Sequence, residues 1–275
     1  MTTWMRLRGE DPMQLVRIRK NAFGYADLNE GMLRLIVIDG DFESEFFRIA
    51  DVLLAGGGTF FDVGANYGLF CFGLVDGVSG SLDFHLFEPN PKLQAAIQRS
   101  AARYPGSGWH LNPVAVSDQP GEVFIKFNDQ HTGESHVTTE GDGTCVQSIV
   151  LDNYVQTHRL SHIAMLKMDV EGFELTALRG LSNTLRERKV GAIYFEYCEQ
   201  WLQRHHEPSE LFAFLNNVGY ECFFCREADL SRYGGQTHKL TPDFGGEIML
   251  ATIEGHALPE ATDLLALPKG IAKSL

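Results

Sequence analysis

The sequence lacks long apolar runs, clustered positive charge and a signal-peptide pattern at its start. No run approaches the length of a membrane span. We therefore expect a cytoplasmic protein without a membrane partner. Lys and Arg number 23 against 36 Asp and Glu, which gives a net charge of −13. This balance argues against a general nucleic-acid binder, because phosphate backbones need clustered Lys and Arg.

Cysteine is scarce, and its spacing does not form a disulfide framework. The five cysteines are an odd number, which favours reduced thiols. Cys222 and Cys225 are three apart, as in redox and zinc motifs, but the stretch 220–225 has the pattern of a strand, in which residues three apart point to opposite faces. We therefore interpret them as small buried hydrophobic residues.

Internal repeats, low-complexity tracts and a recognisable linker are also missing. With 44% hydrophobic and 21% charged residues in a chain of 275, the composition is that of a globular protein with a substantial core. We expect an N-terminal cap over 1–54, one main domain over 55–256 and a peripheral C-terminal tail over 257–275. One interpretation is that the cap covers an edge or a face of the sheet. The other is that part of the cap lines an acceptor pocket.

The stretch from Phe60 to Gly68 organises the chain. Residues 59–63 form a short apolar run that predicts a buried strand, and an apolar segment from Leu69 predicts a helix. Gly64 and Gly68 lie in the turn between them and let the backbone bend sharply and approach a ligand. A strand, a glycine turn and a helix in this order indicate a nucleotide-type pocket.

A second predicted strand, 81–87, ends at Glu88. This carboxylate lies about 20 residues after the turn, the spacing at which an acid reaches the hydroxyls of a bound ribose. The two candidate ligands are a nicotinamide dinucleotide and S-adenosylmethionine. Because Asn66 stands where a dinucleotide turn needs its middle glycine, the turn favours a ligand without pyrophosphate.

Strands and helices alternate along the main domain, which predicts a mainly parallel, doubly wound α/β sheet. Predicted strands cover 109–116, 162–168, 190–195, 221–224 and 247–253, and predicted helices cover 42–54, 93–103, 151–157, 178–185 and 209–218. Strands are also predicted in the cap over 15–18 and 32–38. Ligand sites in such sheets lie beyond the carboxyl ends of the strands, so Asp62, Glu88, Asp169 and Glu196 should share one rim.

An antiparallel excursion interrupts this pattern. Residues 122–127 and 145–150 alternate as strands do, and a polar stretch separates them. Its segment 131–136 is a candidate lid or substrate loop, or a solvated hairpin tip. His131 and His136 are secondary candidates for a general base, whereas His205 and His206 are interpreted as solvated.

Four motifs resemble the FkbM family of S-adenosylmethionine-dependent methyltransferases. They are Asp-Val-Gly-Ala-Asn-Tyr-Gly at 62–68, Phe-Glu-Pro-Asn-Pro at 87–91, Val-Ala-Val-Ser-Asp at 114–118 and Leu-Lys-Met-Asp-Val-Glu-Gly-Phe-Glu at 166–174. The resemblance spans roughly 59–253. It implies a Rossmann-like class I methyltransferase sheet of seven strands with the last one antiparallel, which 248–253 would supply. It also implies O-methylation of a hydroxyl on a sugar, polyketide or other secondary metabolite.

The resemblance also assigns cofactor-binding positions. The turn that cradles the methionine part corresponds to Asp62, Gly64, Ala65, Asn66, Tyr67 and Gly68. Glu88, followed by Pro89, corresponds to the ribose-binding acid. The border of the adenine ring corresponds to Val116, Ser117 and Asp118.

Two carboxylates, Asp169 and Glu171, are the candidate catalytic residues. They follow the predicted strand 162–168, where a positioned base could take the proton of an acceptor hydroxyl. In the alternative interpretation Asp169 orients the cofactor's amino group and Glu171 caps the next helix. No metal is assigned, although Asp169 with Glu196 could hold Mg²⁺. A nicotinamide-dependent oxidoreductase and a non-catalytic cofactor-binding domain remain as alternative functions.

Overall fold

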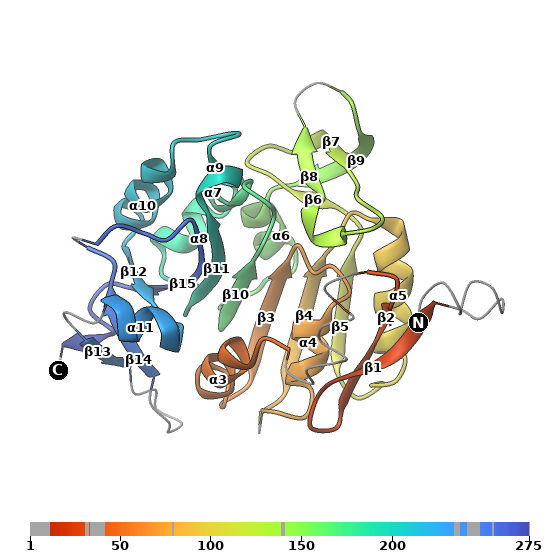
Figure 1. Cartoon of the computed structure of the whole chain (residues 1–275), viewed down its shortest axis with the longest axis horizontal. Helices are drawn as coiled ribbons and strands as arrows, with labels where there is room; N and C mark the ends of the chain where they lie inside the picture. Colours follow the sequence, from red (N-terminus) through yellow and green to blue (C-terminus); the bar gives the residue numbers. More distant parts are fainter. Residues whose placement is uncertain are drawn as a thin grey trace.

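The computed structural model describes residues 12–30, 33, 42–78, 80–138, 141–233, 237–240, 248–254 and 256–274. A large twisted sheet with helices on both faces dominates them (Figure 1). Its ten strands are, in spatial order, β16 (Lys273–Ser274), β13 (Thr237–Leu240), β14 (Ile248–Thr252), β12 (Tyr220–Phe224), β15 (Ala261–Pro268), β11 (Ile193–Cys198), β10 (Met165–Met168), β3 (Gly58–Val63), β4 (Leu82–Phe87) and β5 (Gly108–Asn112).

Five neighbouring strands, from β11 to β5, run parallel. Their side chains are buried on both faces, because alternate residues of β3 and β4 belong to two separate cores. One core lies under α3 (Ser44–Leu53), α4 (Leu69–Leu74) and α5 (Pro91–Ala101), and the other under α6 (Leu151–Thr157), α7 (Glu174–Arg179), α8 (Ser182–Arg186) and α10 (Pro208–Asn217). The predicted doubly wound α/β fold is confirmed.

The identity of the antiparallel strand was predicted wrongly. β15 pairs antiparallel with both β11 and β12, whereas β14 pairs only with β12 and β13 further out. The segment 257–275 is therefore not a peripheral tail. Its run from Leu264 to Leu267 is at most 1% exposed, since it fills the slot between β11 and β12. With β13, β14 and β16 added, the sheet exceeds the expected seven strands.

Two other segments also differ from their predictions. The predicted strand over 109–116 is broken at Pro113, which has no N–H to donate. Its end, β6 (Ala115–Val116), joins a smaller sheet with β9 (Thr144–Ile149), β7 (Gly121–Lys126) and β8 (His136–Thr138). The predicted helix over 178–185 is two short helices, α7 and α8, which are separated by Gly180 and Leu181.

The described part of the predicted cap contains a hairpin of β1 (Met13–Arg19) and β2 (Ala22–Asp27). It packs on α4 and α5 and not on a sheet edge (Figure 1). The hydroxyl of Tyr104 accepts from the Phe23 N–H at 2.7 Å, and the Ser100 hydroxyl accepts from the Tyr25 N–H at 2.8 Å. The predicted strand over 32–38 lies outside the described residues except Leu33. The division into cap and main domain stays a prediction.

No helix among the residues that the structure describes is long and apolar enough to cross a membrane. The five cysteines are free thiols that form no disulfide bond.

Candidate active site

Two adjoining cavities open beyond the carboxyl ends of β4, β3, β10 and β11. The first lies towards β4 and the small sheet. The second is larger, about 480 Å³, and extends towards β11 and β15. The residues that line both are Asn66, Thr132, Gly133, Asp169 and Glu171. Of the four carboxylates predicted to share one rim, Asp169 lies between the two cavities, Glu88 lines the first and Glu196 the second, whereas Asp62 lines neither.

The turn after β3 is shaped by close approach of backbones. Gly64 has φ 74°, and a Cβ there would collide with the carbonyl oxygen of Asp169 on the neighbouring strand end. Asn66 adopts φ 52°, a left-handed conformation that asparagine tolerates better than most residues. Gly68, at φ 71°, precedes α4 and packs on Phe72. The turn can thus expose main-chain groups to a ligand.

Glu88 ends β4 and fixes the geometry of this turn. Its side chain is buried, and its two oxygens accept hydrogen bonds from the Asn66 N–H at 2.9 Å and the Asn90 N–H at 2.8 Å. Burial raises the pKa of Glu88 to about 7, although these hydrogen bonds lower it. Glu88 lines the first cavity, so its remaining lone pairs can receive hydroxyl groups of a ligand.

A buried lysine joins the turn to the end of β10. Lys167 Nζ donates to the Gly64 carbonyl at 2.9 Å and lies 3.5 Å from Asp62 and 3.4 Å from Asp169. Burial lowers the pKa of the ammonium, but the Asp169 and Asp62 carboxylates outweigh this effect and leave the pKa raised. Asp62 is fully buried beneath the turn, where it also accepts from the Cys71 thiol at 3.3 Å. Asp62 lines neither cavity, and its charge faces the Lys167 ammonium.

The loop after β10 places Glu171. Glu174 Oε1 accepts from the Val170 N–H at 3.0 Å and the Gly172 N–H at 3.2 Å, so Glu174 and not Glu171 caps this loop. Glu171 itself has φ 53°, which costs energy for a residue with a side chain. Gly172, at φ 94°, lies so close to the Trp201 carbonyl that a Cβ would not fit. The loop is therefore held in a conformation that presents Glu171 to both cavities.

Three carboxylates meet at this point. Oxygen atoms of Asp169, Glu171 and Glu196 all lie within 4.8 Å of one another. Burial, followed by the charge of Asp169, raises the pKa of both Glu171 and Glu196 well above the usual range. Such a cluster can share a proton at neutral pH, and it can also attract a cation.

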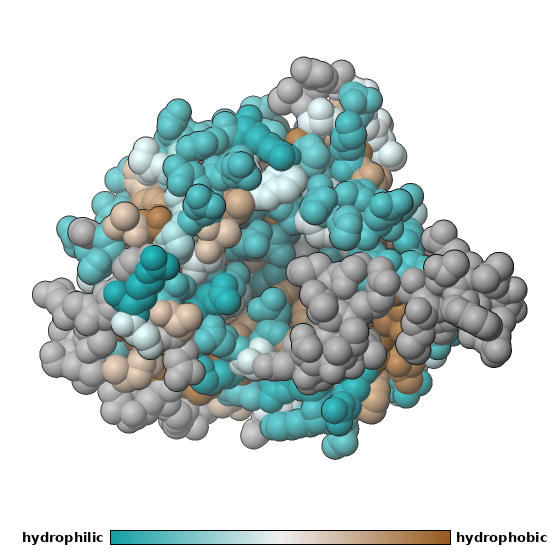
Figure 2. All heavy atoms as spheres, in the orientation of Figure 1, coloured by the Kyte–Doolittle hydropathy of each residue, from teal (hydrophilic) through white to brown (hydrophobic). Residues whose placement is uncertain are grey.

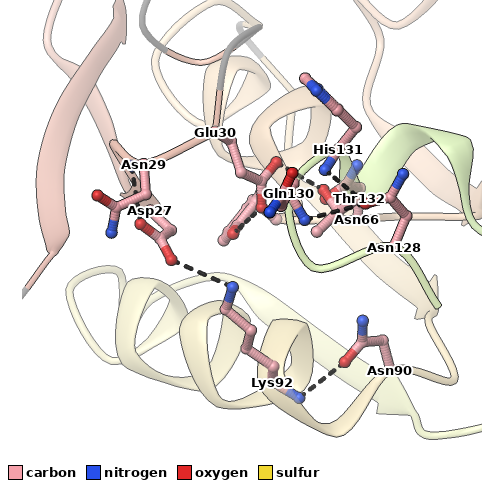
Figure 3. A network of polar contacts seen from close by, with 11 residues as sticks. Asp27, Asn29, Glu30, Asn66, Asn90, Lys92, Asn128, Gln130, His131 and Thr132 are labelled. Carbon is pink, nitrogen blue, oxygen red and sulfur yellow. Dashed lines mark hydrogen bonds and ion pairs between the residues drawn. The ribbon is translucent and has the colours of Figure 1, made fainter. Parts of the chain in front are cut away.

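A polar network that the sequence did not reveal ties the predicted substrate loop to the turn (Figure 3). Glu30, just after β2, is 3% exposed and accepts from the hydroxyls of Tyr67 at 2.5 Å and Thr132 at 2.8 Å. The Thr132 hydroxyl is also 3.0 Å from Asn66 Oδ1. Burial raises the pKa of Glu30. The segment 131–136 is thus a wall of both cavities and not a solvated tip.

The far wall of the larger cavity comes from β11, β15 and α9 (Glu199–Leu202). It includes Tyr194, Trp201 and Asp263, and Asp263 is the register partner of Glu196. Burial, followed by the charge of Glu43, raises the pKa of Asp263 to about 7. Hydrophilic residues cover much of the face around this opening (Figure 2). The second cavity is therefore rich in carboxylates and bounded by aromatic rings.

The structure brings most of the predicted site residues together. Those that line a cavity are Gly64, Ala65, Asn66, Tyr67, Glu88, Pro89, Val116, Asp169, Glu171, Glu196, His131 and His136. Those that do not are Asp62, Gly68, Ser117 and Asp118. Ser117 is turned away because its N–H is bonded to the Ile149 carbonyl in the small sheet and its carbonyl packs on Gly180. Of the three residues predicted to border an adenine, only Val116 lines a cavity.

The lining of the first cavity offers groups of the kind that a nucleoside binds. It combines one acid that can accept two hydroxyls, Glu88, with apolar walls for a base from Leu93, Val114, Val116 and Phe127. Where the two cavities join, Asp169 and Glu171 offer carboxylate oxygens to both spaces. A parallel sheet with a ligand cleft at this edge and an inserted antiparallel strand, β15, defines the Rossmann-like class I methyltransferase fold.

Comparison with known proteins identifies the family. Residues 62–222, more than half of the chain, match the methyltransferase FkbM domain. The chain belongs to the FkbM family of methyltransferases, which use S-adenosylmethionine as methyl donor. This assignment decides against the nicotinamide-dependent oxidoreductase.

Individual relatives are distant. The hexuronic acid methyltransferase AglP of Haloferax volcanii is 30% identical over 127 residues, which cover 46% of this chain and 50% of AglP. The methyltransferase FkbM structure from Methylobacillus flagellatus has a TM-score of 0.41 at 17% identity, covering 70% of this chain and 42% of that one. A precorrin-6y C5,15-methyltransferase from Geobacter metallireducens has a TM-score of 0.42 at 12% identity, covering 82% and 88%. The chain thus spans about half the length of AglP.

Proposed function

We propose that this methyltransferase methylates a hydroxyl oxygen of a small polyhydroxylated acceptor, and that Glu171 is the general base. The acceptor would occupy the larger cavity. Its volume of about 480 Å³ can admit a small molecule such as a sugar, and its polar lining can bond several hydroxyls. Trp201 and Tyr194 add aromatic side chains to the same wall.

The observation that carries this proposal is the position of Glu171. It lines both cavities, and the strained backbone at this residue is kept by the Glu174 cap. A base needs a pKa that is not far below the working pH, and burial, followed by the charge of Asp169, raises the pKa of Glu171 above its usual range. Asp169, which lies against Lys167, is then the positioning carboxylate.

The residues that would hold the cofactor are Glu88 on the ribose, Val116 beside the adenine and the turn from Gly64 to Tyr67 on the methionine part. The cofactor supplies an already activated methyl group. What remains for the protein is to align the acceptor oxygen with it and to remove the hydroxyl proton. Glu171 accepts that proton, and the ammonium of Lys167 limits the build-up of negative charge between Asp62 and Asp169.

We further propose that the acceptor is a sugar or a related polyol. The distant relative AglP is named for a hexuronic acid, itself a sugar derivative. Transfer should not need Mg²⁺, because Lys167 already provides a positive charge 3.4 Å from Asp169. Activity that survives removal of divalent ions with EDTA would support this, whereas activity that returns only with Mg²⁺ would assign Asp169, Glu171 and Glu196 as its ligands.

The test uses S-adenosylmethionine and a panel of sugars and macrolides, with mass spectrometry to detect one added methyl. With a productive acceptor, Glu171→Gln should lower kcat by about 10²- to 10⁴-fold, the usual contribution of a positioned base. Glu199→Gln, an acid of α9 that lines neither cavity, is the matched control. Undiminished turnover in Glu171→Gln would refute the assignment of the base, and methyl found on nitrogen or carbon would refute O-methylation.

A further inference from the structure

A second cluster of ligating side chains lies away from the two cavities, near the sheet edge formed by β5. Asp83 and His85 are two residues apart on β4 and therefore project from the same face. His110 on β5 is the register partner of His85. The two imidazole rings stack at 4.3 Å with an angle of 8° between their planes. Three potential metal ligands thus come from adjacent strands of a rigid sheet.

The Asp83 carboxylate bridges the two histidines. It accepts from His110 Nε2–H at 2.9 Å through Oδ1 and from His85 Nε2–H at 3.2 Å through Oδ2. One nitrogen of each histidine and a carboxylate oxygen lie within 4.8 Å of one another. The residue opposite Asp83 is Gly108, and a Cβ there would collide with Oδ1. Glycine at this position leaves room for the carboxylate between the strands.

The buried side of the cluster is already organised. His85 is 1% exposed, and its other ring nitrogen, Nδ1, is 2.8 Å from the Tyr154 hydroxyl of α6. A tyrosine hydroxyl can donate or accept, so it supports His85 both when Nε2 carries the proton and when Nδ1 does. The Tyr154 ring stacks in turn on His158 at 3.9 Å. Metal-binding histidines commonly have such a partner, which orients the ring and sets the tautomer.

We propose that Asp83, His85 and His110 bind one divalent transition-metal ion, with Zn²⁺ as the reference ion. Two imidazoles and a carboxylate are ligands that this class of ion accepts, whereas Mg²⁺ and Ca²⁺ prefer oxygen donors. Binding replaces the two hydrogen bonds of Asp83 with metal bonds and moves the Nε2 protons of His85 and His110 to their Nδ1 atoms. It also requires the partly exposed His110 ring to tilt out of its stack on His85, so that both Nε2 atoms face the ion. Asp83 and His110, each 44% exposed in the side chain, leave an open side for water as a fourth ligand.

The ion would fasten the edge strand β5 to β4. Its site is separate from the methyl-transfer site, since Asp83 precedes Glu88 by five residues, or about 16 Å of extended strand. The proposal does not depend on the identity of the acceptor.

The experiment is a calorimetric titration of the EDTA-treated full chain with Zn²⁺ under reducing conditions. It is carried out in a Cys145→Ser background, because Cys145 is an exposed thiol that could also bind zinc. We expect one equivalent to bind and the melting temperature to rise. Binding should be lost in His110→Gln and in Asp83→Asn, two partly exposed positions where folding is not at risk. Tyr154→Phe should weaken binding by about 10- to 100-fold, as outer partners of metal ligands typically do.

Two controls separate this site from other zinc ligands. His131→Gln removes an exposed loop histidine, and Glu196→Gln disrupts the carboxylate cluster of the active site; both should leave the affinity for Zn²⁺ unchanged. Co²⁺ in place of Zn²⁺ should give a visible absorption band typical of low coordination number, absent in His110→Gln. Lack of zinc binding by the parent chain, or unchanged binding in His110→Gln, would overturn the proposal.

Discussion

Replacing Glu88 by glutamine tests how the cofactor is held. In the native chain both oxygens of this buried carboxylate accept backbone N–H groups, one from Asn66 in the turn and one from Asn90. Glutamine has a single oxygen, so its amide would point a donor at one of these N–H groups. It also removes the charge that strengthens hydrogen bonds from the ribose hydroxyls.

The expected loss follows from hydrogen-bond energies. A hydrogen bond to a charged group contributes about 1.5–3 kcal/mol, and losing one such bond weakens affinity by roughly 10- to 150-fold. Calorimetric titration with S-adenosylhomocysteine measures this change directly. The melting temperature of the ligand-free variant shows how much of the effect comes from the turn itself.

Asp118→Asn is the matched control for this experiment. The sequence motif also assigns Asp118 to the cofactor, but its side chain lines neither cavity, so the variant should bind S-adenosylhomocysteine as the wild type does. Equal affinity of wild type and Glu88→Gln would refute the assignment of the first cavity to the nucleoside. Weakened binding in Asp118→Asn would show that the adenine lies nearer the small sheet.

Three further changes test the carboxylate cluster, the turn and the loop. Glu196→Gln should stabilise the ligand-free protein at pH 8, where each 1 kcal/mol corresponds to about 2–4 °C in melting temperature. It should also move the rise of kcat with pH to lower pH, because Glu171 loses a negative neighbour. Gly64→Ala should abolish S-adenosylhomocysteine binding, since the added methyl group meets the Asp169 carbonyl, whereas Gly106→Ala, with open space around it, should bind normally. Thr132→Val should make the loop over 128–135 more sensitive to limited proteolysis and raise KM, because the loop loses its hydrogen bonds to Glu30 and to Asn66 of the turn.

The pH dependence of stability has a definite sign. Burial raises the pKa of Glu88, Glu174 and Asp263 to about 7, so the folded state keeps protons that the unfolded chain has already lost. Stability from these groups is present below about pH 4.5 and is lost as the pH rises towards 7 and above. The ligand-free protein should therefore melt at a lower temperature at pH 8 than at pH 5.5. A higher melting temperature at pH 8 would contradict this, and a Glu174→Gln variant should reduce the difference.

The sequence revealed those parts of the site that depend on local pattern. Glu88 and Gly64 follow from the strand, turn and acid spacing, and Asp169 with Glu171 from the end of β10. Asp118 lines neither cavity, and its place in the cofactor site stays a prediction, because a motif gives chain position and not the direction of a side chain. The strand just before it, β6, pairs with β9 of the small sheet.

The residues that the sequence missed depend on contacts between distant segments. Glu30 lies near the turn only because the hairpin of β1 and β2 packs on α4 and α5. Asp263 reaches Glu196 because β15 enters the middle of the sheet from what was predicted to be a tail. The sequence pattern that could have revealed β15 is the apolar run from Leu264 to Leu267, which is typical of a strand buried on both faces.

The most direct test of the account is methyl transfer itself. The wild-type chain is incubated with trideuteromethyl-labelled S-adenosylmethionine and a panel of sugars, and the position of the label in any product is determined by mass spectrometry and NMR. The account predicts label on a hydroxyl oxygen with wild type and a strongly reduced yield with Glu171→Gln. Label on nitrogen or carbon, or equal yields from the two proteins, would contradict it.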